Sequence, residues 1–429
     1  MIRPDDGLYA ALVRRGMSRR AFLKFSAAMA AALALPPAYA PRIAAAVESA
    51  PRLPVIWLRG QACGGDTEAF LQAADPTVPE LVLDLLSIEY HDALMTASGE
   101  AAVAARTAAM ARYPDGYLAV VEGAIPSADA AMACTVGGIA FGDVVREVCG
   151  GAAATIAVGS CAFDGGAPGA DRGPTHAVGV EEAAGDAVRD GRLVNLPGCP
   201  VNVVNLTATI VHYLTFKELP PVDAKRRPLF AYGNLLHNQC ERRGHYEFGE
   251  FALAWGDEGA QKGWCLYKLG CKGPETFANC PTALYAEGTS WAIKAGHGCI
   301  GCTMPGFWDS MGPAYQRLPA PIPFAANVPA AHVGALLVGG VAAVTIAHGA
   351  ATYAREVGRR VRARRRSETV DFTLPRPAER PAAATPPLTQ PPAAATPPST
   401  EPPAAATPPI SVEPPASSAS PGPPAPGGA

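Results

Sequence analysis

The stretch Pro54-Val-Ile-Trp-Leu-Arg-Gly60-Gln-Ala-Cys63-Gly-Gly-Asp66 indicates how this chain folds. Its first half is a short apolar run, which predicts a buried β-strand. The two glycines after Cys63 allow a tight turn, and Thr67-Glu-Ala-Phe-Leu can begin a helix. The pattern is therefore a strand, then a loop that carries a potential ligand, then a helix.

Three later segments end in the same way, each with an apolar strand that leads into a loop. They are Tyr117–Gly123, Thr155–Cys161 and Leu193–Cys199, and helical patterns such as Glu100–Arg112 and Gly142–Cys149 lie between them. Alternating strands and helices predict an α/β fold with a doubly wound parallel sheet. Ligands of such sheets bind at the carboxyl ends of the strands. Cys63, Cys161 and Cys199 should therefore converge on a metal centre at one edge.

This centre has three cysteines and needs a fourth ligand. Asp66 stands three residues after Cys63, where a Cys-x-x-Cys pair would place its second thiolate. A carboxylate can bind iron, although it is a harder donor than sulfur. Alternatively, Asp66 stabilises the N-terminus of the helix that begins at Thr67, or Cys134 is the fourth ligand. Cys149 lies among apolar residues and is expected to be a buried thiol.

The densest group of cysteines lies further along the chain. Six cysteines and one histidine occur in His237-Asn-Gln-Cys240, Cys265-Leu-Tyr-Lys-Leu-Gly-Cys271, Cys280-Pro and Cys299-Ile-Gly-Cys302. Thiolate selects iron–sulfur clusters, zinc or copper(I), and imidazole can join it. The seven ligands divide into a first set of four, which could close one centre, and a last set of three. Structural zinc takes four ligands, so the set of three favours an iron–sulfur cluster with one corner missing.

Together these segments resemble the small subunit of nickel–iron hydrogenases. The resemblance spans about residues 54–310 and rests on Pro54-Val-Ile-Trp-Leu, Gly60-Gln-x-Cys63, Tyr90-His-Asp-Ala-Leu-Met-x-Ala-Ser-Gly-Glu100, Glu122-Gly-Ala-Ile-Pro126, Gly159-Ser-Cys161-Ala, Pro197-Gly-Cys199-Pro, Cys265-Leu-Tyr-Lys-Leu-Gly-Cys271-Lys-Gly-Pro, Asn279-Cys280-Pro and Gly296-His-Gly-Cys299-Ile-Gly-Cys302. It implies a flavodoxin-like domain at 47–225 and a smaller, irregular cluster-binding domain at 226–320.

The resemblance also implies three clusters, in agreement with the division by ligand count. A proximal [4Fe–4S] cluster would use Cys63, Asp66, Cys161 and Cys199. A medial [3Fe–4S] cluster would use Cys280, Cys299 and Cys302. A distal [4Fe–4S] cluster would use His237, Cys240, Cys265 and Cys271.

Asp66 departs from the family pattern, because most members have cysteine there. A carboxylate at this position is similar to the variant of oxygen-insensitive, actinobacterial-type hydrogenases, which are usually not exported. The other oxygen-tolerant type has two extra cysteines near the proximal cluster. The matching positions here are Gly65 and Gly166.

Residues 1–46 are predicted to be an export signal. Met17-Ser-Arg-Arg-Ala-Phe-Leu-Lys-Phe25 precedes an apolar run, which is typical of the twin-arginine pathway. A basic amphipathic N-terminus is the alternative. Cleavage sites of small residues end at Ala40 and Ala46, and the second is preferred because Pro41 would follow the first cut. This pathway carries folded proteins, so a metal cofactor can be inserted before export.

Residues 328–353 are largely apolar and predict one C-terminal transmembrane helix, with a buried soluble helix as the alternative. Seven arginines follow within 354–366, and positive flanks stay cytoplasmic, so the cluster domains should lie outside. His332 and His348, near the two ends of the span, are candidates for haem contact or for capping and snorkelling at an interface. The Pro/Ala-rich tail at 367–429 is predicted to be disordered.

The composition excludes some classes of function. A net charge of −3 lacks the excess of positive charge that is typical of nucleic-acid-binding proteins. Eleven clustered cysteines are too few and too unevenly spaced for a fold held by disulfide bonds. We expect the electron-transfer subunit of a membrane-bound, outward-facing uptake hydrogenase. Such a subunit needs a nickel–iron large subunit, passes electrons to a cytochrome b and quinones, and leaves room for a dimer of heterodimers.

Two alternatives remain, and one further residue needs a role. The alternatives are an exported, membrane-anchored binding protein with structural zinc and the related cluster-bearing subunit of NADH dehydrogenase, which has only one cluster. Glu122 stands at the end of a predicted strand, at the edge of the sheet where the clusters should bind. It is expected to be either a structural carboxylate or a proton relay.

Overall fold

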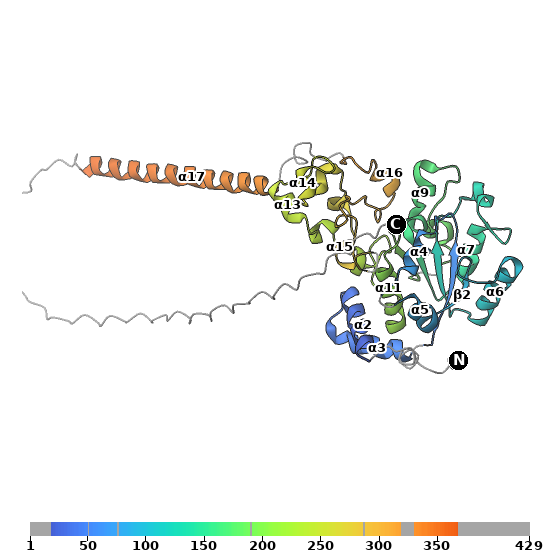
Figure 1. Ribbon diagram of the computed structural model, residues 1–429. Coiled ribbons are helices and arrows are strands. Elements are labelled where there is room, and N and C mark those ends of the chain that lie inside the picture. Colours follow the sequence, from blue (N-terminus) through green and yellow to red (C-terminus); the bar gives the residue numbers. More distant parts are fainter. Residues whose placement is uncertain are drawn as a thin grey trace, which may run out of the picture. The chain divides into compact units, whose positions relative to one another are not determined.

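A five-stranded parallel sheet forms the larger domain (Figure 1). This computed structural model describes residues 19–49, 51–74, 77–188, 191–285, 288–318 and 330–367. The strands are β1 (Leu53–Arg59), β2 (Leu86–His91), β3 (Leu118–Glu122), β6 (Ala154–Val158) and β7 (Leu193–Leu196), in the order β2-β1-β3-β6-β7. Numbered along the chain, these strands run 2-1-3-4-5, which is the flavodoxin-like order. The predicted fold class is confirmed.

Both faces of the sheet are covered, which explains why its strands are apolar without interruption. Val55 and Trp57 of β1 belong to one buried cluster, whereas Ile56 and Leu58 belong to the other. The helices α4 (Gly65–Leu71) and α11 (Val203–Phe216) pack in the first cluster. The helices α6 (Gly99–Arg112) and α7 (Phe141–Gly150) pack in the second.

Shorter elements complete this domain. They are α5 (Val78–Glu80), η2 (Leu81–Leu85), η3 (Ala128–Ala133), the hairpin of β4 (Thr135–Val136) and β5 (Ile139–Ala140), α8 (Gly159–Asp164), α9 (Gly166–Gly169), η4 (Ala170–Arg172) and α10 (Val180–Ala184). The helix α8 begins directly after β6, so it holds Cys161 at the carboxyl edge of the sheet.

The segment predicted as the export signal packs against the larger domain. It forms α2 (Arg19–Ala32), η1 (Pro37–Tyr39) and α3 (Ala40–Ser49), and both α2 and α3 contact α11. Phe22, Phe25, Ile43 and Val47 are buried in the same cluster as Trp57. The preferred cleavage position after Ala46 therefore lies inside a packed helix.

The smaller domain consists of turns and very short helices around a compact apolar cluster. These helices are α12 (Leu229–Tyr232), η5 (Leu236–Gln239), α13 (Arg243–Phe248), α14 (Glu258–Gln261), η6 (Leu266–Leu269), η7 (Gly273–Glu275), α15 (Cys280–Ala283) and α16 (Phe307–Ser310). Leu236, Leu266, Trp291 and Ile293 form its core together with Cys271 and Cys299. A core this small leaves much of the loop geometry to be held by other contacts.

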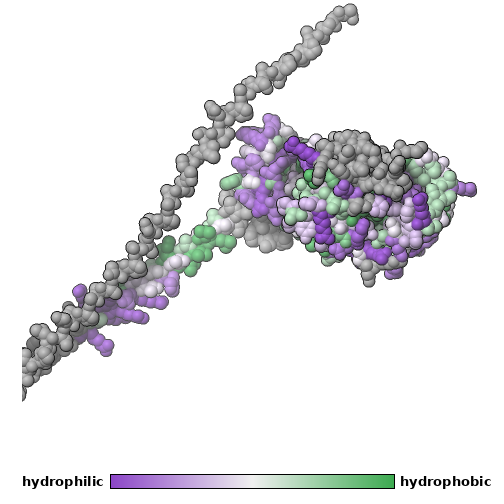
Figure 2. All heavy atoms as spheres, turned by 90° about the horizontal axis from the view of Figure 1, so that it is seen from below, coloured by the Kyte–Doolittle hydropathy of each residue, from purple (hydrophilic) through white to green (hydrophobic). Residues whose placement is uncertain are grey.

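One long helix, α17 (Ala330–Ser367), ends the described chain. It continues past the predicted span into the arginine-rich flank, and Figure 2 shows an apolar stretch followed by hydrophilic side chains. Among the described residues, this is the one helix long and apolar enough to cross a membrane. His348 is exposed on it, whereas the side chain of His332 and the tail after Ser367 lie outside the described residues.

Candidate metal centres

The loops after β1, β6 and β7 bring four of the predicted ligands together. Burial, and after it the negative charges of Asp66, Cys199 and Cys63, raises the pKa of the Cys161 thiol to about 12. The same two neighbours, Asp66 and Cys63, raise the pKa of Cys199, which burial raises most. Groups that repel one another in this way lie close together, and a bound cation would offset the repulsion.

Asp66 is directed into the protein beside the thiols. Its side chain is 8% exposed, and its Oδ1 accepts a hydrogen bond of 2.7 Å from the Val201 amide. A Cβ atom on Gly159 would lie 2.6 Å from its Cγ and closer still to Oδ2, so only glycine leaves room for it there. Burial raises the pKa of Asp66 to about 7. Asp66 lies in the first turn of α4, whose N-cap residue is Gly64, so a favourable interaction of its carboxylate with the helix N-terminus stays open beside the ligand role.

The surroundings of Cys63 and Cys161 provide space and amide donors. The Gly65 amide donates to Cys63 Sγ at 3.3 Å. A Cβ atom on Gly65 would lie 3.1 Å from that sulfur, and one on Gly166 would lie 2.8 Å from Cys161 Sγ. Hydrogen bonds to sulfur and open space beside it suit the thiolate ligands of a bulky cluster.

A second group of thiols lines a mostly apolar cavity of about 360 Å³. Cys280, Cys299 and Cys302 all border it, together with Cys199 of the first group. Burial raises the pKa values of Cys280 and Cys302 to about 12 and raises that of Cys299 as well. The Gly301 amide donates to Cys299 Sγ at 3.4 Å. Three thiols that border one mostly apolar cavity suit a three-cysteine cluster.

The third group forms a small hollow in the same domain. His237, Cys240, Cys265 and Cys271 line it. The Arg242 amide donates to Cys240 Sγ at 3.4 Å, and Cys271 Sγ accepts from the amides of Gly273 and Cys299 at 3.4 and 3.3 Å. Burial raises the pKa of Cys265 to about 12, and burial lowers the pKa of His237, which favours the neutral imidazole that binds metals.

The second group of thiols adjoins both the first and the third. Cys199 of the first group acts electrostatically on Cys302 of the second, and the Ser160 hydroxyl beside Cys161 donates to the Cys302 carbonyl at 2.5 Å. Cys299 of the second group donates its amide to Cys271 of the third. Within the described ranges, no three His, Cys, Asp or Glu side chains close on a single metal ion.

Two cysteines stay apart from these groups. Cys149 is buried in the core on α7, as its apolar neighbours indicated, and burial raises its pKa to about 12. Cys134 packs at the edge of the same core, and burial alone raises its pKa. Neither lines the cavities that hold the other thiols.

Glu122 is the centre of a buried hydrogen-bond network that the sequence did not reveal. It is fully buried, and it accepts hydrogen bonds from Trp57 Nε1 at 3.1 Å, from the Thr67 amide at 3.3 Å and from the Thr67 hydroxyl. Arg59 Nε lies 3.7 Å away, and His91 Nε2 contacts the Thr67 hydroxyl at 3.3 Å. These donors satisfy the buried carboxylate and link the end of β3 to the first turn of α4, as expected for a structural carboxylate.

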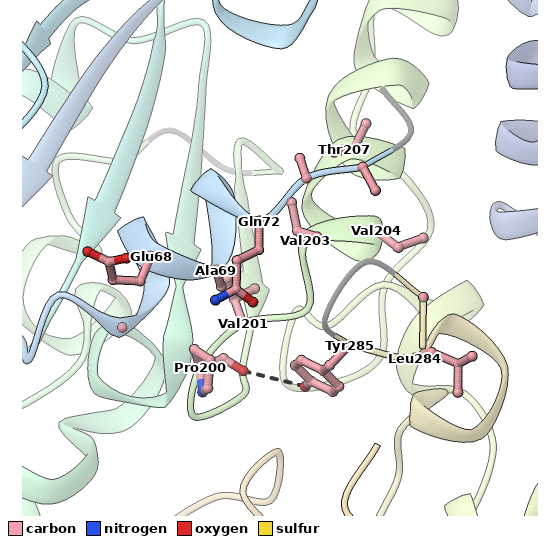
Figure 3. Close-up of a pocket in the computed structure, with 14 residues that line it drawn as sticks. Glu68, Ala69, Gln72, Pro200, Val201, Val203, Val204, Thr207, Leu284 and Tyr285 are labelled. Atoms are coloured by element: carbon pink, nitrogen blue, oxygen red, sulfur yellow. Dashed lines mark hydrogen bonds between the residues drawn. The ribbon is translucent and has the colours of Figure 1, made fainter. Parts of the chain in front are cut away.

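A separate hollow of about 340 Å³ lies beside the Cys199–Pro200 loop, between α4 and α11 (Figure 3). Figure 3 shows the Tyr285 hydroxyl directed at the Pro200 carbonyl, 3.4 Å away. Within the described residues no thiol lines this hollow. Its position does identify Tyr285 as a residue that bridges the two domains at the Cys199 loop.

Comparisons with known proteins agree with this arrangement. The family of C-terminal regions of NiFe/NiFeSe hydrogenase small subunits matches residues 232–315, and the family "NADH ubiquinone oxidoreductase, 20 Kd subunit" matches residues 63–213. The family of twin-arginine translocation signal sequences matches residues 16–36. The first match covers the second and third groups of thiols, which distinguishes this chain from the respiratory subunit.

Whole-chain relatives point the same way. The uptake hydrogenase small subunit of Azotobacter vinelandii is 44% identical over 347 residues, which cover 81% of this chain and 96% of the relative. The quinone-reactive Ni/Fe-hydrogenase small chain of Wolinella succinogenes is 43% identical over 304 residues, covering 70% and 84%.

A comparison of the fold with a solved structure leads to the same family. The reduced, active Ni-Fe-Se hydrogenase of Desulfomicrobium baculatum matches with a TM-score of 0.59 at 32% identity, over 62% of this chain and all of that chain. Sequence and fold therefore agree, and the chain belongs to the family of electron-transfer small subunits of nickel–iron hydrogenases.

Proposed function

We propose that this subunit holds three iron–sulfur clusters and passes electrons from its large subunit to the membrane. The observation that supports this most is that each group of thiols adjoins the next: Cys199 acts on Cys302, and the Cys299 amide donates to Cys271. The ligand sets are Cys63, Asp66, Cys161 and Cys199, then Cys280, Cys299 and Cys302, then His237, Cys240, Cys265 and Cys271. When bound, the clusters supply one-electron steps from one set to the next.

Asp66 is proposed as the fourth ligand of the first set. Its buried carboxylate acts electrostatically on Cys161 and Cys199, whose raised pKa values mean that a nearby cation would favour their thiolate forms. The Val201 amide and the absent side chain at Gly159 hold and accommodate this carboxylate. A carboxylate in place of thiolate is a harder donor and should change the properties of that site.

The ligands also receive support from the chain around them. Backbone amides donate to several of the sulfurs, among them those of Cys63, Cys240, Cys271 and Cys299, and such hydrogen bonds stabilise the negative charge of a thiolate. The thiols beside Ile293, Leu236 and Trp291 are shielded from water. The protein thus contributes position, amide dipoles and exclusion of water.

The electron exit is proposed to lie at the membrane. The twin-arginine signal and the apolar helix α17 support an exported, anchored subunit, and the quinone-reactive relative supports a link to quinones. We propose a cytochrome b as the membrane partner, cluster domains on the outer side, and arginines after residue 354 inside. Haem contact by His332 or His348 belongs to the same proposal, as does a dimer of heterodimers.

The test is co-purification with the large subunit, followed by iron and sulfide analysis, hydrogen-dependent dye reduction and Mössbauer spectroscopy. We expect a brown complex with three distinguishable clusters. Asp66→Ala should alter only the proximal Mössbauer signal, whereas Asp66→Cys should give an all-thiolate site. A colourless protein that contains zinc and no inorganic sulfide would reject the proposal in favour of structural zinc.

A further inference from the structure

Lys272 is a completely buried cation between two of the proposed ligand sets. It follows Cys271 directly, its side chain is 0% exposed, and its amide donates to the Cys299 carbonyl at 2.7 Å. Its Nζ donates to the carbonyl of Pro313 at 3.0 Å and to that of Gln316. Burying an ammonium group is costly, so a charge retained here needs a reason.

The charge of Lys272 reaches thiols of both sets. Burial lowers the pKa of Lys272 and the cation of Arg317 lowers it further, whereas the negative charges of Glu275, Cys271 and Cys299 raise it. Glu275 forms its ion pair with Arg317, whose guanidinium also stacks over the Tyr267 ring at 3.7 Å. The acceptors of Lys272 Nζ are thus neutral carbonyls.

Two neutral carbonyls do not require a cation. An amide or hydroxyl could satisfy them at a lower cost of desolvation. The hydrogen bonds therefore supply no counter-charge, and the negative groups that act on Lys272 are Glu275, which is shared with Arg317, and the sulfurs of Cys271 and Cys299. The electron-rich centres proposed on either side are the natural counter-charge.

We propose that Lys272 is a positioning residue whose fixed charge raises the reduction potentials of the medial and distal centres together. The inference rests on the proposed function, since it assumes those two centres. Reduction adds one negative charge to a cluster, and a nearby cation buried from water favours the reduced form. The same side chain holds the Pro313–Gln316 segment against the ligand loop. Because its charge acts on both, Lys272 keeps the reduction potentials of the medial and distal centres close to each other.

The test compares charge with hydrogen bonding in the intact complex with its large subunit. Lys272→Met removes the charge and the donor, Lys272→Gln removes only the charge, and Lys272→Arg keeps both. Lys262→Met is the matched control, because Lys262 is 56% exposed in the same domain and pairs with Glu258. Each centre is titrated against applied potential by electron paramagnetic resonance.

We expect more negative midpoints for the medial and distal centres in Lys272→Met and Lys272→Gln. The proximal midpoint should be unchanged, and Lys272→Arg and Lys262→Met should match the wild type. Unchanged medial and distal midpoints in a neutral variant that retains its iron would overturn the inference. So would shifted midpoints or lost clusters in Lys272→Met together with wild-type midpoints in Lys272→Gln, which would indicate a hydrogen-bonded tether alone. Absence of the clusters from the wild type would instead reject the proposed function.

Discussion

Gly159→Ala tests whether the Asp66 carboxylate lies where the structure places it. Gly159 has φ +78°, and its added methyl group would lie 2.6 Å from Asp66 Cγ. The left-handed backbone costs an alanine about 1–2 kcal/mol. At a pH above the pKa of about 7, where Asp66 is charged, displacing it from the Val201 amide costs about 1.5–3 kcal/mol, because a charged acceptor loses its donor. The free energy of unfolding should therefore fall by roughly 2.5–5 kcal/mol.

Gly138→Ala is the matched control for the backbone cost. Gly138 has φ +82°, and a Cβ atom there meets nothing within 4 Å. Its loss should be about 1–2 kcal/mol, so the difference between the two variants measures the contact with Asp66.

The assay is thermal unfolding of the purified complex, in which 1 kcal/mol corresponds to about 2–4 °C for a domain of this size. Asp66→Ala should suppress the extra loss of Gly159→Ala in a double-mutant cycle. If Gly159→Ala and Gly138→Ala lower the melting temperature equally, the placement of Asp66 is wrong.

Three further predictions concern other parts of the chain. Burial lowers the pKa of His91 from 6.5 to about 4, so the unfolded chain takes up a proton first, and about 3 kcal/mol of the folding stability present above pH 6.5 should be lost as the pH falls to 4. His91→Gln should therefore flatten the dependence of melting temperature on pH, and an unchanged slope would contradict this prediction. Replacing Cys134 or Cys149 by alanine should leave iron content at the wild-type value, whereas Cys302→Ala should lower it, as measured by metal analysis. Removing residues after 318 should release the complex from membranes without detergent, and persistent membrane association would argue against α17 as the anchor.

Several features of the site followed from local sequence alone. The apolar runs before Cys63, Cys161 and Cys199 predicted parallel strands, and the carboxyl ends of such strands meet at one edge. The ligand spacing separated the last seven ligands into four and three. Family motifs then predicted a hydrogenase small subunit, which the relatives confirm.

Other features were out of reach because they depend on partners far apart in the chain. Glu122 and Trp57 are 65 residues apart, and Lys272 meets Pro313 across 41 residues. The sequence left Asp66 open between ligand and helix N-terminal residue, and only the packed structure brings its carboxylate, in the first turn of α4, to the Val201 amide 135 residues away. The packing of the predicted export signal on α11 was likewise not predicted, because an apolar sequence does not specify the surface against which it packs.

The sequence by itself determined the order of elements, the identity of the candidate ligands and the apolar C-terminal helix, because these depend on residue type and spacing. Only the tertiary structure decided which groups lie next to one another: Cys199 beside Cys302, Cys271 beside Cys299, and Lys272 between two ligand sets. The reason is that these neighbours are brought together by packing and by the loss of water around buried charges. Both are properties of the folded chain as a whole.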